Sequence, residues 1–302
     1  MKKLVIAAGT GFLGQVLANH FKDTFEEIAI LTRGKSEKVE NINCVHWDAK
    51  TLTGWKNTLE NATVLINLAG KSVDCRYTDE NKKEILASRI DSTKILNLAV
   101  LQCENPPLLW LNSGTATIYR HSLDKQMDEE TGEIGDNFSM NVAKAWESAF
   151  FETDTPKTRK TVLRTSIVLG KKGGAYLPLK NLAKLGFGGK QGNGNQFVSW
   201  IHEKDFANAV AFIIEKQLTG VVNIVAPNPV PNCEFMKAMR KSLGVPTGIP
   251  IGEKLLKIGA KLIGTETELV LKSRNVIPKR LIENGFTYEF SNIEKALNDL
   301  AN

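Results

Sequence analysis

One stretch near the start of the chain, residues 4–21, limits the possible folds more than any other. It begins with the apolar run LVIAA, breaks at Gly9, Gly11 and Gly14, and resumes with apolar residues at helical spacing. This order predicts a strand, a glycine turn and a helix. Glycines let the backbone approach a ligand closely, and unpaired N–H groups at the start of the helix can hold a phosphate. The residues expected to bind a dinucleotide are Gly9, Thr10, Gly11, Phe12, Leu13 and Gly14.

A secretory signal peptide is the alternative interpretation, because Lys2 and Lys3 precede the apolar run. Such a peptide needs an uninterrupted apolar segment of roughly seven residues or more, whereas this run ends at Gly9. The glycine spacing is also unusual, since Ala8 takes the place of the first glycine. A second predicted strand over 27–32 completes the start of a βαβ unit, which favours the dinucleotide site.

Size and composition suit one large α/β domain with a smaller appendage. The chain has 302 residues, 42% of them hydrophobic, so it can bury a full core. The net charge of +6 is spread along the chain and mixed with acidic residues, so we expect no nucleic-acid partner. No apolar run approaches the roughly 18 residues that span a bilayer, and we expect no membrane insertion.

The cysteine and histidine patterns favour a reduced protein without a metal site. The four cysteines include no C-x-x-C pair, and the four histidines form no ligand motif. We therefore expect a cytoplasmic protein, and the sequence leaves its oligomeric state open. The four thiols expected to be free are those of Cys44, Cys75, Cys103 and Cys233.

Strand and helix patterns alternate through residues 1–170 and then change. We predict an α/β fold, with a Rossmann-type, doubly wound parallel sheet that binds NADP in residues 1–170. A smaller, mostly helical substrate-binding domain is expected in residues 171–302. One further strand, near 221–226, should return to the sheet. The other predicted elements are strands over 42–46, 63–68, 108–112 and 161–167 and helices over 79–101, 138–151 and 203–216.

In a doubly wound sheet the cofactor crosses the carboxyl ends of the strands. Leu68, Ala69 and Gly70 follow one predicted strand and should pass beneath the cofactor, although an ordinary strand-to-loop glycine has the same pattern. Thr32 and Arg33 end the second strand, where NAD-selective proteins place a carboxylate. Arg33 can bind a 2′-phosphate, so we expect NADP(H) to be preferred, with NAD(H) still able to bind. The alternative is an exposed loop arginine.

Residues 9–14, 67–70 and 113–119 keep the order of three motifs of the extended short-chain dehydrogenases/reductases, which the chain resembles. Further motifs narrow the resemblance to the atypical "epimerase family protein" branch of the NAD-dependent epimerase/dehydratase superfamily, which has a C-terminal domain of unknown function. The resemblance implies a cofactor domain that holds adenine near Trp47 and Asp48, followed by a substrate domain. The motifs of the branch are Ala69-Gly70-Lys71, Arg76-Tyr77-Thr78, Ser88-Arg89, Trp146-Glu147, Gln196, Ser199-Trp200-Ile201-His202, Pro278-Lys279-Arg280-Leu281 and Gly285-Phe286.

Catalysis in the superfamily, as the resemblance implies it, depends on a Ser/Thr, a Tyr and a Lys. Thr115 matches the first and would polarise a substrate oxygen; the alternative is a strand-end threonine bonded only to its own backbone. Lys144 matches the lysine that binds the nicotinamide ribose, although a solvated helix lysine fits equally well. The tyrosine position holds Met140, whose thioether cannot donate a proton.

Two functions from different classes follow. The first is an NADP-dependent oxidoreductase or epimerase that acts on a small molecule, such as a sugar nucleotide or a carbonyl compound, with the tyrosine replaced by Met140. The second is a non-catalytic, NADP(H)-sensing binding protein. His202 fits a packed histidine as well as a functional one. An enzyme is favoured by the residues expected to line a substrate cleft, which are Arg76, Gln196, Ser199 and Trp200.

Overall fold

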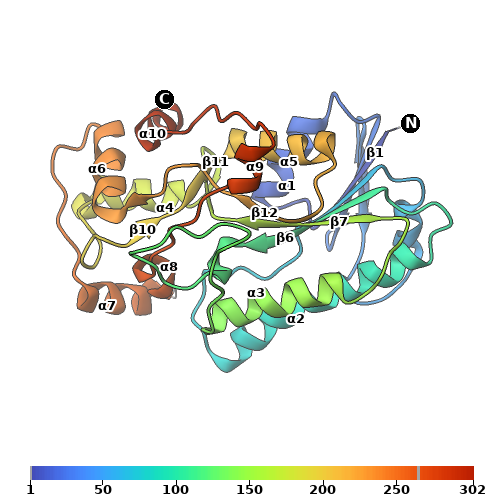
Figure 1. The fold of residues 1–302 in the computed structure, drawn as a ribbon, viewed down its shortest axis with the longest axis horizontal. Helices are drawn as coiled ribbons and strands as arrows, with labels where there is room; N and C mark the ends of the chain where they lie inside the picture. The colour runs from blue at the N-terminus through green and yellow to red at the C-terminus, as the bar shows by residue number, and fades with distance from the viewer. Residues whose placement is uncertain (1, 264–265) are drawn as a thin grey trace.

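A mostly parallel sheet forms the centre of the protein (Figure 1). The structure, a computed structural model, describes residues 2–263 and 266–302. The strand order is β12-β7-β6-β5-β1-β2-β4-β3, and only the β3/β4 pair is antiparallel. This confirms the predicted doubly wound α/β fold. The strands are β1 (Lys3–Ala7), β2 (Glu27–Thr32), β3 (Glu37–Val39), β4 (Ile42–His46), β5 (Val64–Asn67), β6 (Leu109–Thr115), β7 (Arg159–Thr165) and β12 (Gly220–Ile224).

Helices cover both faces of this sheet (Figure 1). Alternation along the strands gives each face its own apolar core. Leu4 and Ile6 of β1 join the core under α1 and α5, whereas Val5 and Ala7 join the core under α2 and α3. The helices are α1 (Phe12–Phe21), α2 (Asp79–Leu101), α3 (Phe138–Phe151) and α5 (Glu203–Lys216).

Polar residues that precede the helices determine where several of them begin. The Thr78 hydroxyl accepts a hydrogen bond from the Asn81 N–H at the start of α2 (3.2 Å). The ring nitrogen Nδ1 of His202 does the same for the Lys204 N–H at the start of α5 (3.1 Å). Each contact satisfies an N–H group that has no partner within its helix.

Strand β6 is longer than the sequence predicts. Its pairing with β7 continues through Ser113 and Gly114 to the register pair Thr115 and Thr165. The short edge strand β3 was not predicted, because three residues carry too little periodicity. The extended pairing places Thr115 at the carboxyl edge of the sheet.

The C-terminal part packs around a separate core that includes Trp200, Phe235 and Phe290. Two small sheets, β11-β8-β9 and β10-β13, connect it to the main sheet. Among the described residues, no helix is both long and apolar enough to cross a membrane. The elements are β8 (Ile167–Gly170), β9 (Gly173–Gly174), α4 (Tyr176–Leu182), η3 (Ala183–Phe187), β10 (Phe197–Val198), β11 (Trp200–His202), β13 (Val230–Pro231), α6 (Asn232–Ser242), α7 (Glu253–Ile263), α8 (Glu268–Leu271), α9 (Lys279–Glu283) and α10 (Ile293–Ala301).

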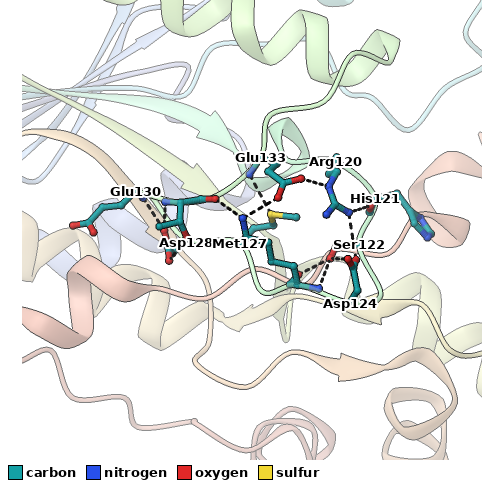
Figure 2. A network of polar contacts seen from close by, with 10 residues as sticks. Arg120, His121, Ser122, Asp124, Met127, Asp128, Glu130 and Glu133 are labelled. Atoms are coloured by element: carbon teal, nitrogen blue, oxygen red, sulfur yellow. Dashed lines mark hydrogen bonds and ion pairs between the residues drawn. The ribbon is translucent and has the colours of Figure 1, made fainter.

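The loop between β6 and α3 holds a C-terminal segment against the carboxyl edge of the sheet. The Met127 N–H donates to the carbonyl of Asn275 (2.7 Å), and the Ile277 N–H donates to the carbonyl of Met127 (2.9 Å). Within the loop, Arg120 pairs with Glu133, as Figure 2 shows. The residues just before α9 are therefore fixed beside the strand ends.

Candidate cofactor and substrate site

The turn after β1 has the backbone geometry of a phosphate-binding loop. Ala8 adopts a left-handed conformation, φ 58°, and its N–H donates to the Leu31 carbonyl (2.8 Å). A Cβ atom on Gly14 would lie 2.2 Å from the carbonyl oxygen of Gly9, so only glycine permits this approach of helix to turn. Among the described residues, no side chain caps the start of α1, which leaves its first N–H groups free for an anion.

Phe12 and Leu13 contribute their backbone rather than their side chains to this turn. Both side chains pack against the core under α1 and α5. The Phe12 ring lies against the β8-β9 hairpin, where a Cβ on Gly170 would come within 2.2 Å of it. A groove of about 430 Å³ runs along α1 and includes Thr10 and Lys22, but its lining contains neither Arg33 nor Thr115. The groove therefore reaches the glycine turn at Gly9 and Thr10 but not the ends of β2 and β6.

At the end of β2, Arg33 is exposed and Thr32 is buried. The Thr32 hydroxyl accepts a hydrogen bond from the Gly34 N–H (3.1 Å), which shapes the turn. Within the described parts of the chain, Arg33 forms no ion pair, so its guanidinium group is free to bind a phosphate. The residues present thus fit a cofactor with a 2′-phosphate.

The Trp47 side chain is not available to adenine, which the family resemblance places near Trp47 and Asp48. Its side chain is 2% exposed and packs edge-on against Trp55, with ring centroids 5.3 Å apart. Asp48 is exposed, but its carboxylate accepts hydrogen bonds from the backbone of Lys50 and from the backbone and hydroxyl of Thr51. These bonds lower the pKa of Asp48 to about 2. Trp47 is a core residue, and Asp48 closes its own turn.

A buried amide pair shapes the turn after β5. The Asn67 side chain donates to the Asn112 side chain (2.8 Å) and accepts from the Ala69 N–H (3.0 Å). Leu68, Ala69 and Gly70 are thereby held at the strand ends where a cofactor would cross. A Cβ on Gly70 would lie 3.1 Å from the Arg89 guanidinium carbon, so this turn rests directly on α2.

The Thr115 hydroxyl lies at the carboxyl end of β6 and is half-buried. It accepts a hydrogen bond from the Thr117 N–H (3.1 Å) at the start of η2 (Ala116–Ile118). Its proton is donated to no described residue. Thr115 therefore bonds to the local backbone, as in the alternative of an ordinary strand-end threonine. Its O–H donor nevertheless stays free for the catalytic role.

Lys144 and Met140 have different environments on α3. The Lys144 ammonium group forms an ion pair with Asp136 at 2.5 Å, and its side chain is 39% exposed. Met140 is 1% exposed, and its sulfur accepts a hydrogen bond from the Asn137 N–H (3.4 Å). A Cβ on Gly135 would lie 2.2 Å from that sulfur. The Met140 side chain fills the space beneath the preceding loop and does not reach the sheet edge as an open site residue.

Three residues predicted to line a substrate cleft are structural instead. Gln196, Ser199 and Trp200 are each at most 3% exposed. The Ser199 hydroxyl donates to the Arg274 carbonyl (2.7 Å) and accepts from the Val276 N–H (2.9 Å). The Gln196 amide donates to backbone carbonyls, and the Trp200 indole N–H donates to a carbonyl at 3.2 Å. The Ser199 hydroxyl, the Gln196 NH₂ group and the Trp200 N–H thus bind backbone and are not available to a substrate.

Arg76 and His202 also have local partners. Arg76 forms an ion pair with Glu266 at 3.1 Å and is partly exposed. His202 is fully buried and stacks on Phe290, with ring centroids 3.9 Å apart. Burial lowers the pKa of His202 to about 4. The ring is therefore neutral at pH 7, and His202 is a packed histidine.

Sequence reasoning assigned no role to two guanidinium groups, that of Arg89, which it named only within a family motif, and that of Arg274. Arg89 lies on the buried face of α2, four residues after Ile85 and seven before Leu96, both of which are fully buried. An arginine at that spacing on an apolar face was the available signal. Arg274 gave no such signal, because its burial depends on the loop that contains Met127.

Comparisons with known proteins match nearly the whole chain. A family model described as the NAD dependent epimerase/dehydratase family matches residues 4–225, and a domain of unknown function matches residues 253–300. The "Epimerase family protein YfhF" of Bacillus subtilis is 31% identical, over 98% of this chain and 97% of its own length.

Two solved structures match the fold closely. A crystal structure of human epimerase family protein SDR39U1 (isoform 2) with NADPH has a TM-score of 0.87 at 29% identity, covering 99% of both chains. A nucleoside-diphosphate sugar epimerase from Corynebacterium glutamicum has a TM-score of 0.77 at 26% identity. The match to the latter covers 99% of this chain and 58% of the epimerase.

Proposed function

Because the chain belongs to the NAD dependent epimerase/dehydratase family, we propose that it is an NADP(H)-dependent oxidoreductase or epimerase-like enzyme that acts on a small molecule. The observation that carries the proposal is the placement of three features along one sheet edge. These are the uncapped start of α1, the free Arg33 guanidinium group after β2, and the Thr115 hydroxyl after β6. The NADPH in the human neighbour's structure supports the choice of cofactor.

Each of these features has a separate role in the proposal. The glycine turn and the first N–H groups of α1 would hold the pyrophosphate, and Arg33 would hold the 2′-phosphate. The turn over 68–70 would support the cofactor from below. When bound, NADP(H) supplies or accepts a hydride. Thr115 would donate a hydrogen bond to the substrate oxygen, where negative charge develops during that transfer.

The proposal assigns no general acid to Met140, which replaces the tyrosine of the superfamily. A positioned general acid contributes typically 10²–10⁴-fold to rate. A threonine hydroxyl is a poor acid at neutral pH, so ordinary carbonyl reduction should be slow. We place Lys144 at the ribose, which requires it to leave Asp136 when the cofactor binds.

Calorimetry with both cofactors, combined with an assay of NADPH oxidation on sugar nucleotides and small carbonyl compounds, tests this function. We expect NADPH to bind more tightly than NADH, and Thr115→Val to reduce turnover without changing cofactor affinity. Failure of NADPH to bind would contradict the proposal.

A non-catalytic NADP(H) sensor is the second candidate, and the enclosure of Met140 favours it. The two candidates differ in one measurement. An enzyme oxidises NADPH in the presence of its substrate. A sensor also binds NADPH, but it gives no turnover with any compound of the panel.

A further inference from the structure

Three polar side chains from separate parts of the chain come together beside the turn that follows β5. Tyr77 lies just before α2, Arg89 lies within α2, and Arg274 lies between α8 and α9. Arg274 lies 3.9 Å from Glu268, which accepts a hydrogen bond from Ser139, the residue after Phe138, whose ring packs on Tyr77. Arg89 lies against Gly70 in the turn that follows β5 and, like Arg274, interacts electrostatically with Tyr77. The loop between β6 and α3 fixes the segment that carries Arg274 at this place.

Arg89 is mostly buried and has no carboxylate partner. Its guanidinium group donates to the carbonyls of Lys71 (3.0 Å) and Ile85 (2.9 Å) and lies over the Trp146 ring. No Asp or Glu among the residues that the structure describes forms an ion pair with it, and residues 1, 264 and 265 are not acidic. Burial lowers the pKa of Arg89 to about 10, so the group is still charged at pH 7. The charge is held beneath Gly70 without an opposite charge.

Arg274 is anchored through its backbone, whereas its guanidinium group lacks part of its hydrogen-bond partners. Its N–H donates to the Phe197 carbonyl (2.8 Å), and its own carbonyl accepts from Ser199 (2.7 Å). The Nη1 atom is buried and has no hydrogen-bond partner among the described residues. The Nη2 atom lies 3.9 Å from Glu268, a carboxylate that already accepts from Lys272 at 2.6 Å. One of the two terminal nitrogen atoms of this group is therefore unpaired.

The Tyr77 hydroxyl is the third unpaired group. It is buried and lacks a hydrogen-bond partner within the described chain. The ring is fixed by an edge contact with Phe138, with centroids 5.1 Å apart. Burial raises the pKa of Tyr77 to about 12, so the hydroxyl keeps its proton and can donate it. An orphaned buried donor destabilises the fold, and buried charges are normally paired.

Together the three side chains present hydrogen-bond donors and two positive charges, of which only that of Arg274 has a carboxylate, Glu268, within 4 Å. Guanidinium groups bind oxygen anions through parallel N–H bonds, and a neutral phenol adds one donor. We propose that Tyr77, Arg89 and Arg274 bind one oxyanion of the substrate, a carboxylate or a phosphoryl group. This inference rests on the proposed function, since it specifies the substrate of that same site. It predicts an acidic substrate whose charged end lies beyond the turn over 68–70.

Calorimetric titration of NADPH-saturated protein tests the proposal, with inorganic phosphate and malonate as probes and the ionic strength held constant with sodium chloride. We expect saturable binding of at least one probe, with a dissociation constant of about 1 mM. Tyr77→Phe and Arg274→Gln should each weaken it by about tenfold or more, because each removes a hydrogen bond to a charged group. The probe that binds identifies the anion as phosphoryl or carboxylate.

Arg159→Gln is the matched control. It removes one positive charge from the start of β7, where Arg159 pairs with Gln217, and should leave probe affinity within about twofold of wild type. Tyr77→Phe retains the ring that packs on Phe138, so it does not depend on whether Arg274→Gln folds. Lack of binding of both probes, or equal binding by wild type and Tyr77→Phe, would overturn the proposal. The NADPH titration that precedes each run tests the proposed function separately.

Discussion

Two arginine-tyrosine groups lie near the carboxyl edge of the sheet, and they differ in one respect. Arg164 forms a two-pronged ion pair with Glu147, at 2.8 and 2.7 Å, and also donates to the Tyr119 hydroxyl at 2.8 Å. That hydroxyl donates in turn to Asn223 at 3.0 Å. In the group of Tyr77, Arg89 and Arg274, by contrast, two buried polar atoms have no partner. The first group is closed and the second is open.

The difference separates residues that stabilise the fold from residues that, in our proposal, bind a ligand. Removing one member of a closed buried network destabilises the protein, because the remaining members lose their partner. An open group already bears that penalty in the free protein, so removing a member changes stability little. Stability and binding measurements should therefore assign the two groups to different roles.

Glu147→Gln should have the largest effect on stability. It leaves the Arg164 guanidinium group, 9% exposed, without its opposite charge. The expected loss in the free energy of unfolding is about 3–5 kcal/mol. Urea denaturation measures it, with Arg274→Gln as the open-group control, for which we expect a loss below about 1 kcal/mol. Equal losses in both variants would show that the closed and open groups contribute equally to stability.

His202 adds a buried group that titrates but belongs to neither group, since its Nε2 atom lies 3.3 Å from the Asp299 carboxylate and has no hydrogen-bond partner among the described residues. Its pKa in the folded protein, about 4, lies below the ordinary value. The unfolded chain therefore takes up the proton first, and stability is lost as the pH falls from about 6.5 towards 4. The expected loss is at most about 3 kcal/mol. His202→Asn keeps a cap for α5 but does not titrate, so the variant should lack this part of the pH dependence.

Arg33→Glu tests an unpaired cation at the surface rather than in the interior. A charge-assisted hydrogen bond to the 2′-phosphate is worth about 1.5–3 kcal/mol, so NADPH affinity should fall about ten- to a hundredfold. NADH lacks that phosphate and should change by less than about threefold. Calorimetry with both cofactors measures this, and an equal loss for the two would assign Arg33 to general charge attraction.

The smallest and sharpest contrast is between two conservative substitutions. Tyr119→Phe removes a hydroxyl with two partners and should cost about 1–3 kcal/mol of unfolding free energy. Tyr77→Phe removes a hydroxyl with none and should be neutral within about 0.5 kcal/mol, or stabilising. Thermal and urea denaturation of the pair measure the difference. A clear loss of stability in Tyr77→Phe would mean that its hydroxyl is paired.

Local patterns predicted the elements of this fold well. The helix over 138–151 has the bounds that its periodicity indicates, and the helix over 79–101 begins after its cap, Thr78. The glycine turn was predicted because short-range sterics require small residues wherever backbone meets backbone. The position of Arg33 was predicted from equally local information, because it depends only on where the second strand ends.

Side-chain exposure in the C-terminal part could not be predicted in this way. Gln196, Ser199 and Trp200 look polar or amphipathic in sequence, yet each bonds to backbone of a distant segment. Trp47 likewise meets Trp55 across a turn. Such partners lie outside any local window, so the same residue types fit both a cleft and a core.

The sequence by itself determined the alternating α/β order, the glycine turn after β1 and the position of Arg33 at the end of β2. Each of these depends on neighbours within one or two turns of chain, where periodicity and backbone sterics act. Only the tertiary structure decided that Met140 is enclosed and that Tyr77, Arg89 and Arg274 share one place. Burial and pairing of charge depend on which distant segments pack together, and that packing is a property of the whole fold.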